Sequence, residues 1–173
     1  MPLQGIHPGR AGGREKPRRL AQPVQVDFAD PGAYTRNEIW PAMTIHERTI
    51  PAGTWVNSHY VHMDVSTPQA TILRGTITFD SDIVGVVVTD RRLLATDAAL
   101  GAPGTVYADS ARRTVELENA DRLVISADRR SIDITMALSD GPLDEFRVLT
   151  AAPSSDHTPP TITFGGNAGT YTV

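Results

Sequence analysis

Residues 70–88, ATILRGTITFDSDIVGVVV, constrain the fold of this chain more than any other stretch. From Thr76 to Asp80 every second residue is apolar, and this period of two predicts a strand whose Ile77 and Phe79 face a core. The following run, Val84–Val88, is rich in β-branched apolar residues, which predicts a strand buried on both faces. We therefore expect a chain that is built on β-sheet.

Other short strands are predicted on both sides of this stretch, separated by turns that are rich in Gly, Pro and Asp. They cover Val24–Phe28, Met43–Ile50, Thr54–Asp64, Thr114–Leu117, Arg122–Ser126, Ser131–Leu138 and Glu145–Thr150. Between Thr89 and Gly101 the apolar residues recur at helical spacing, which predicts one short helix near residues 91–100. The pattern indicates an all-β fold, a jelly-roll-like β-sandwich with this one helix.

The sequence also divides into four parts. Residues 1–22 hold five basic residues and have no periodic pattern, so we expect a disordered basic tail. Residues 23–150 are expected to form the β-sandwich domain, and the Pro-rich residues 151–160 a linker. Residues 161–173 are too few to bury an apolar face of their own, which predicts an isolated strand or the start of a truncated Ig-like domain.

Composition excludes several classes of function. The chain has 173 residues, a net charge of -4 and no cysteine. The charge gives no reason to expect nucleic acid as a partner, and the lack of cysteine excludes disulfides and thiolate metal sites. The apolar runs are shorter than the roughly 18–20 residues that span a bilayer, so no membrane span is expected. The sequence contains no phosphate loop, dinucleotide fingerprint or serine-nucleophile elbow, and no residue is assigned a catalytic role.

Two groups of side chains are candidate metal ligands. Asp80 and Asp82 form an Asp-x-Asp turn whose oxygen atoms suit calcium, and a solvated turn is the competing interpretation. His59, His62 and Asp64 are similar to a fragment of the first cupin motif, which would bind a transition metal. The spacing of three residues places the two histidines on opposite faces of a regular strand, which favours ordinary strand histidines. We therefore expect either no cofactor or a bound calcium ion.

Aromatic side chains provide a candidate ligand site. Trp55 and Tyr60 could stack on a sugar ring, because aromatic faces are apolar contacts for carbohydrates. Their opposite strand parity favours core packing instead. The acidic pair Asp144 and Glu145 suggests the two carboxylates of a glycosidase, but adjacent strand residues point apart, and we reject that reading.

Four segments carry a resemblance to a known kind of domain. They are Ser58–Asp64, Gly75–Val86, Leu94–Tyr107 and Asp144–Thr150. Together they resemble an uncharacterised domain of bacterial secreted proteins, over about residues 24–150. Such domains often occur with cell-surface sorting tails or Ig-like repeats, and residues 159–173 resemble the opening strands of a bacterial Ig-like domain. The resemblance implies an extracellular or cell-surface location in a truncated multidomain protein, and it implies no known reaction.

Three hypotheses about function follow. The first is a non-enzymatic extracellular β-sandwich module with an adhesive, glycan-binding or structural role, whose partners are glycans or neighbouring protein subunits. The second is a self-assembling surface or filament subunit, joined to its neighbours by strand addition from Thr161–Val173 or Val24–Phe28. The third is a cupin-like metal-dependent enzyme that uses His59 and His62.

Overall fold

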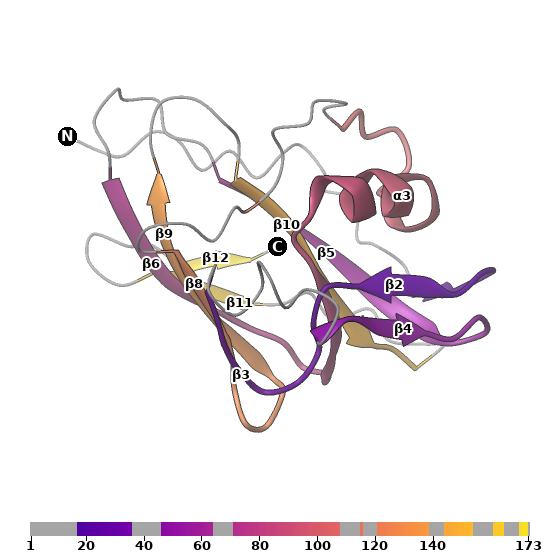
Figure 1. Cartoon of the computed structure of the whole chain (residues 1–173), viewed down its shortest axis with the longest axis horizontal. Helices are drawn as coiled ribbons and strands as arrows, with labels where there is room; N and C mark the ends of the chain where they lie inside the picture. The colour runs from indigo at the N-terminus through magenta and orange to yellow at the C-terminus, as the bar shows by residue number, and fades with distance from the viewer. Residues whose placement is uncertain are drawn as a thin grey trace.

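The computed structural model describes residues 17–35, 46–63, 71–107, 115, 121–138, 144–153, 161–164 and 170–172. These residues form antiparallel β-sheets and the eleven-residue helix α3 (Asp90–Leu100), as Figure 1 shows. The prediction of an all-β, sandwich-like fold with a short helix near residues 91–100 is confirmed. No helix within the described part of the chain is long and apolar enough to cross a membrane.

A four-stranded sheet with the order β1-β5-β10-β7 forms the middle layer of the fold. Its strands are β1 (Arg18–Arg19), β5 (Trp55–Met63), β10 (Asp144–Ala151) and β7 (Ile83–Val87). Strand β10 pairs with β5 along one edge and with β7 along the other. The register places Arg147 opposite Tyr60 and Glu145 opposite His62.

A six-stranded sheet with the order β12-β11-β6-β9-β8-β3 packs on one face of the middle layer. Its strands are β12 (Thr170–Thr172), β11 (Thr161–Phe164), β6 (Thr71–Thr78), β9 (Ser131–Leu138), β8 (Arg122–Ile125) and β3 (Gly32–Tyr34). The first apolar core joins the two sheets and includes Ile77, Ile83, Val86, Ile132 and Phe146. Ile77 and Phe79 are buried, as their alternation with polar residues predicts.

The second face of the middle layer is covered by α3 and by the strand pair β2 (Val24–Val26) and β4 (Arg48–Ile50). A second apolar core fills this side and includes Leu20, Val26, Val56, Val87, Leu93, Leu100 and Leu149. Strand β7 contributes Val86 to the first core and Val87 to the second. The prediction that Val84–Val88 is buried on both faces is confirmed for Val86, Val87 and Val88.

A register shift in β7 brings a glycine under the β2 strand. Leu149 pairs with Gly85 while its neighbour Thr150 pairs with Ile83, so the pairing has a β-bulge. Val26 lies directly over Gly85, where a Cβ atom would be only 2.5 Å from Val26 Cγ1. The close approach of the Val26 side chain requires glycine at this position.

The chain segment Arg18–Leu20 is structured, although it lies within residues 1–22, for which we expected a disordered tail. Arg18 and Arg19 pair with Val56 and Trp55 of β5. The Leu20 amide donates to Thr54 O at 2.9 Å, and its side chain is buried in the second core. Edge pairing and the burial of one leucine explain the order of this segment, and residues 1–16 lie outside the described residues.

The β8–β9 turn contains the one non-glycine residue of positive φ in the described part of the chain, Arg129 at φ 60°. A left-handed backbone costs a residue with a side chain about 1–2 kcal/mol. The ion pair of Arg129 with Asp30 is long, at 3.4 Å, and half-exposed, so it offsets little of that cost. We expect Arg129→Gly to raise the free energy of unfolding by about 1 kcal/mol in urea titrations. Arg130→Gly in the same turn should lower it, and an equal response of both variants would contradict the argument.

Tyr34, a residue of the first core, makes the stability of the fold depend on pH in the alkaline range. Its ring stacks on Phe28, and its hydroxyl donates to Asp30 O at 2.7 Å. Burial first and the charge of Asp30 second raise the pKa of Tyr34 above its ordinary value of 10.0. The folded state therefore holds the phenol proton more tightly, and this stabilisation is complete below pH 10 and is lost as the pH rises through the raised pKa. We expect the stability to decline above pH 10 less steeply in Tyr34→Phe than in the wild type, as measured by urea unfolding at several pH values.

Candidate functional site

A row of polar side chains crosses the face of the middle sheet that lies under α3. The alternation of β5 and β10 places Ser58, Tyr60, Glu145 and Arg147 on the same face as Leu149 of the second core. Ser58, Glu145 and Arg147 are buried among apolar neighbours. Buried polar groups need partners of their own, and the partners here come from the sheet, from α3 and from the loop after it.

Arg147 is the centre of this cluster, because its side chain is 0% exposed. One terminal nitrogen donates to Asp97 of α3 at 2.7 Å, and the other donates to Ser58 at 3.0 Å. The guanidinium carbon lies 5.2 Å from the ring centroid of Tyr60 and 5.5 Å from that of Tyr107, which are cation–π distances. The Nε atom has no hydrogen-bond partner within the described residues. The hydrogen bond from Arg147 to Asp97 therefore holds α3 against the sheet.

Glu145 is the buried carboxyl group of the same sheet face. Its two oxygens take different partners: one accepts from the Tyr60 hydroxyl, and the other lies 2.7 Å from His62 Nδ1. Tyr60 in turn packs edge-on against Tyr107, with ring centroids 4.9 Å apart. These contacts connect Glu145 to the same aromatic pair that flanks Arg147.

Helix α3 is held at its N-terminus by Asp27, a buried residue that follows β2. The Asp27 carboxylate accepts from the backbone amides of Val88 at 2.7 Å and Thr89 at 3.0 Å, and it also pairs with Arg92. Negative charge at this end complements the helix dipole. Burial lowers the pKa of Arg92, but hydrogen bonds and charges from Glu47 and Asp27 outweigh burial and raise it overall. Arg92 thus stays charged, and the start of the helix is fixed.

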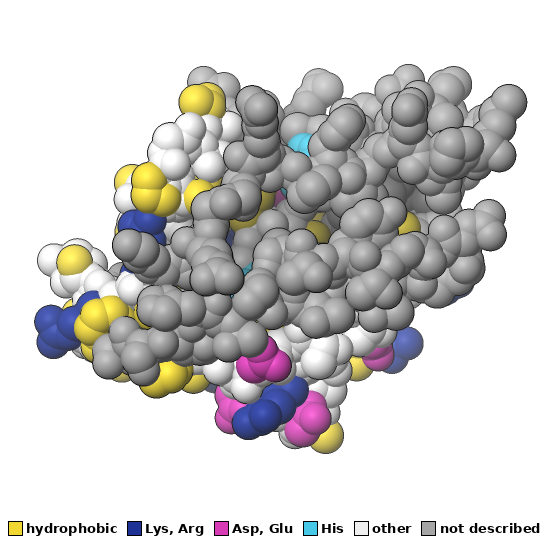
Figure 2. Space-filling model, turned by 180° about the vertical axis from the view of Figure 1, so that it is seen from behind, with side chains coloured by type: hydrophobic (Ala, Val, Ile, Leu, Met, Phe, Trp, Pro, Cys, Tyr) yellow, Lys and Arg dark blue, Asp and Glu magenta, His cyan; other side chains and the backbone are white. Residues whose placement is uncertain are grey.

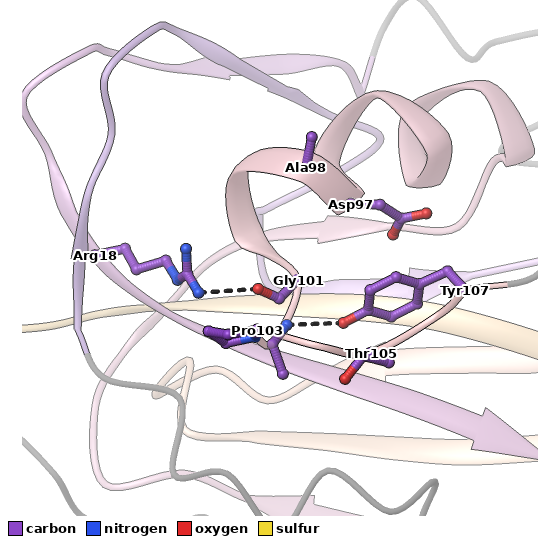
Figure 3. Close-up of a pocket in the computed structure, with 8 residues that line it drawn as sticks. Arg18, Asp97, Ala98, Gly101, Pro103, Thr105 and Tyr107 are labelled. Carbon is purple, nitrogen blue, oxygen red and sulfur yellow. Dashed lines mark hydrogen bonds between the residues drawn. The ribbon is translucent and has the colours of Figure 1, made fainter.

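A shallow depression of about 460 Å³ opens at the other end of α3. Figure 3 shows how three segments line it: Arg18 from β1, Asp97 and Ala98 from the helix, and the loop that runs from Gly101 to Tyr107. The loop folds back because the Ala102 amide donates to the Tyr107 hydroxyl at 2.9 Å. A Cβ atom on Gly101 would lie 2.6 Å from the Tyr107 ring, so glycine makes room for that ring.

The buried and the exposed lining residues of the depression differ in chemistry. Gly101 and Ala102 are small and buried, whereas Ala98, Pro103 and Thr105 are exposed and Tyr107 is half-buried. On the rim, Arg18 donates to the backbone oxygens of Gly101 at 2.9 Å and Ala99 at 3.4 Å. A concave surface with small residues, hydroxyls, one ring and one cation suits a polar organic ligand.

The predicted histidine site is split between the two faces of β5. His59 lies against Phe79 of the first core and 3.1 Å from Thr150, whereas His62 faces Glu145 on the opposite side. Asp64 lies outside the described residues. Within the described part of the chain, no group of three or more His, Asp or Glu residues is arranged to hold a metal ion. The transition-metal site stays a prediction, which metal analysis of the purified protein would test.

The predicted calcium ligands Asp80 and Asp82 lie in the exposed turn between β6 and β7. Asp82 is paired with Arg130 of the β8–β9 turn at 3.4 Å. Seen from behind, acidic and basic side chains lie side by side at the lower edge of the molecule (Figure 2). A neighbouring guanidinium competes with a cation for the Asp82 carboxylate, and calcium binding here stays a prediction.

Trp55 and Tyr60 lie on opposite faces of β5, as their parity predicts. Trp55 is 38% exposed at the start of the strand. Tyr60 is half-buried between Glu145, Arg147 and Tyr107. The two rings form no common platform, and only Tyr60 is connected to the depression, through its contact with Tyr107.

Sequence reasoning missed Arg147, Asp97, Tyr107 and Arg18 as members of one site. A signal for Arg147 was present: Glu145, Arg147 and Leu149 alternate along one strand, so a buried leucine implies two buried charges beside it. The other three residues gave no such signal, because they come together only through the pairing of distant segments. Arg18 and Gly101, for example, are 83 residues apart.

The fold and the site define an all-β sandwich with a polar depression at the end of its helix. Comparison with protein-family models and with curated proteins finds no match for the chain. The resemblance to a domain of bacterial secreted proteins therefore stays a prediction.

Proposed function

We propose that the chain is a non-enzymatic β-sandwich module of an extracellular or cell-surface protein, and that it binds a glycan in the depression at the C-terminal end of α3. The observation that carries the proposal is the depression itself, which an aromatic ring, a hydroxyl and a guanidinium line together with several small residues. Sugar rings need this combination, because they present apolar faces and many hydroxyl groups to the same surface.

The buried cluster behind the depression supports a binding role. Arg147 fixes Asp97 and lies beside the Tyr107 ring, so two lining residues are held in place before any ligand arrives. Such preorganisation lowers the entropic cost of binding. Glu145 and Arg147 are themselves buried and already engaged with side chains of the fold. Their role in the proposal is to position the lining residues and not to contact the ligand.

A glycan array probed with the full chain tests this proposal, with two matched variants. Thr105→Trp adds bulk to an exposed lining residue and should abolish binding to every glycan that the wild type retains. Val106→Trp adds the same bulk one residue further along, at a side chain that is 95% exposed and does not line the depression, and should leave binding unchanged. Substitutions at exposed loop positions have little effect on stability. Absence of binding by the wild type, or equal loss in both variants, would overturn the proposal.

A second candidate function is assembly by strand addition, which the C-terminal strand favours. Thr161–Phe164 pairs with Gly75–Thr78 of β6 in the same chain and thereby extends the six-stranded sheet. The same register would be available to the segment of another copy, as in domain swapping. The high effective concentration of the chain's own segment favours the intramolecular pair in dilute solution.

Light scattering over a range of concentrations tests this second candidate. Assembly by strand addition predicts oligomers whose fraction rises with concentration and which disappear on deletion of residues 161–173. Ile162→Pro should act like the deletion, because proline removes a backbone donor in the middle of β11. Oligomers that persist in both variants would exclude this strand as the link.

A further inference from the structure

We propose that the depression at the end of α3 selects acidic saccharides, and that the Arg18 guanidinium is the contact for the sugar carboxylate. This inference rests on the proposed glycan-binding function and adds a substrate class to it. It starts from the charges that line the depression, of which Arg18 and Asp97 are the two full ones.

Of these two residues, Arg18 is the one whose charge is not paired with an opposite charge of the described residues. Its partners are the backbone oxygens of Gly101 at 2.9 Å and Ala99 at 3.4 Å, and no carboxylate pairs with it among the described residues. A guanidinium has five N–H donors in a planar fork, so donors remain for a ligand after two carbonyl contacts. The side chain is half-buried at the rim of the depression, where those donors are accessible.

Two sources of negative charge lie near Arg18. One is paired with a cation, and the other is smaller than a full charge. Asp97 receives a hydrogen bond from Arg147, a fully buried cation, so the pair contributes little net charge. The C-terminus of α3 carries a partial negative charge of about one half, and its own last turn contains no basic residue. The single positive charge of Arg18 exceeds that partial charge, so the depression favours an anion over a cation.

Shape and donor geometry select the kind of anion. A volume of about 460 Å³ admits a sugar ring, and the open side leaves room for the glycan to continue into solvent. The planar fork of a guanidinium matches the two oxygens of a carboxylate. Figure 3 shows Arg18 and Tyr107 on opposite sides of Gly101, and both residues line the depression, so a ligand bound there lies between them. A uronic acid unit has its carboxylate at the edge of its ring, as this arrangement requires.

The test compares a tetramer of galacturonic acid with its methyl ester, which has the same sugar rings and no charge, by titration calorimetry on the full chain. We expect the acid to bind about tenfold more tightly than the ester, since hydrogen bonds between charged groups are stronger than neutral ones. The preference should shrink as sodium chloride is raised, because salt screens an exposed charge pair.

Three variants assign the preference to one residue. Arg18→Gln should bind acid and ester equally, and Arg18→Lys should keep part of the preference. Arg19→Gln removes the same charge from the next residue, whose guanidinium lies beside Gly53 and outside the depression, and should keep the full preference. Melting temperatures identify any variant that fails to fold.

The outcomes separate this inference from the proposed function. A wild type that binds the ester and the acid alike keeps the glycan-binding function and overturns the selection of acids. The same conclusion follows if folded Arg18→Gln retains the preference. A wild type that binds no glycan in the array or the calorimeter overturns both.

Discussion

Arg147→Ala is expected to lower the free energy of unfolding by about 3–5 kcal/mol, because it removes one partner of a buried ion pair. The change leaves Asp97 without its cation, leaves the Ser58 hydroxyl without its donor, and opens a space between the Tyr60 and Tyr107 rings. Urea unfolding, followed by circular dichroism, measures the loss. Arg122→Ala is the control, since Arg122 is exposed on β8 and its removal should change stability by less than about 0.5 kcal/mol.

A double-mutant cycle with Asp97 shows whether the loss comes from the ion pair. In the Arg147→Ala background, Asp97→Ala should cost almost nothing, because the carboxylate has already lost its buried partner. The double variant Arg147→Met with Asp97→Leu should recover much of the stability, since apolar residues of similar volume need no hydrogen-bond partner. Additive losses in the cycle would show that the two residues act independently, contrary to their 2.7 Å contact.

Gly85→Ala is expected to lower the free energy of unfolding by about 1–3 kcal/mol, as overpacking a core usually does. The new Cβ would lie 2.5 Å from Val26 Cγ1 and 3.0 Å from Val26 Cβ and Cγ2. Val26 is fully buried and β-branched, so its side chain cannot rotate away. The strand β2 would have to move off the sheet instead. Urea unfolding measures the loss directly.

Val26→Ala provides the matched test of this clash. On its own it should cost about 2 kcal/mol, because it removes two buried methyl groups. In combination with Gly85→Ala it should cost less than the sum, by a coupling energy of about 1 kcal/mol, since the methyl groups that collide are gone. A fully additive loss in the double variant would show that contact with Val26 is not the reason for glycine at position 85.

Local alternation was enough to predict the buried faces of β6 and β7, and distant pairing explains what it missed. Ile77, Phe79 and Val86 are buried as their pattern predicts, because a strand's two faces follow from its own residues. Alternation over the predicted strand Val24–Phe28 places Asp27 on the same face as the polar Gln25. The strand instead ends at Val26, and Asp27 is buried because it accepts from the amides at the start of α3. That partner lies about 60 residues away, beyond any local pattern.

The candidate site was harder to predict for the same reason. Arg147 and Tyr60 meet because β5 and β10 are neighbours in the sheet, although 87 residues separate them in sequence. The depression needs three further segments, the strand β1, the end of α3 and the loop to Tyr107. Its residues are ordinary in type and spacing, so the sequence contains no motif that would mark them.

The strand order of the middle sheet has a consequence for how the chain folds during synthesis. No two neighbours in β1-β5-β10-β7 are consecutive in sequence, and β10 joins β5 to β7. A growing chain therefore holds β5 and β7 without their shared partner until Asp144–Ala151 has been made. Loop closure over such separations is slow, so the middle sheet is completed only after β10 has been made.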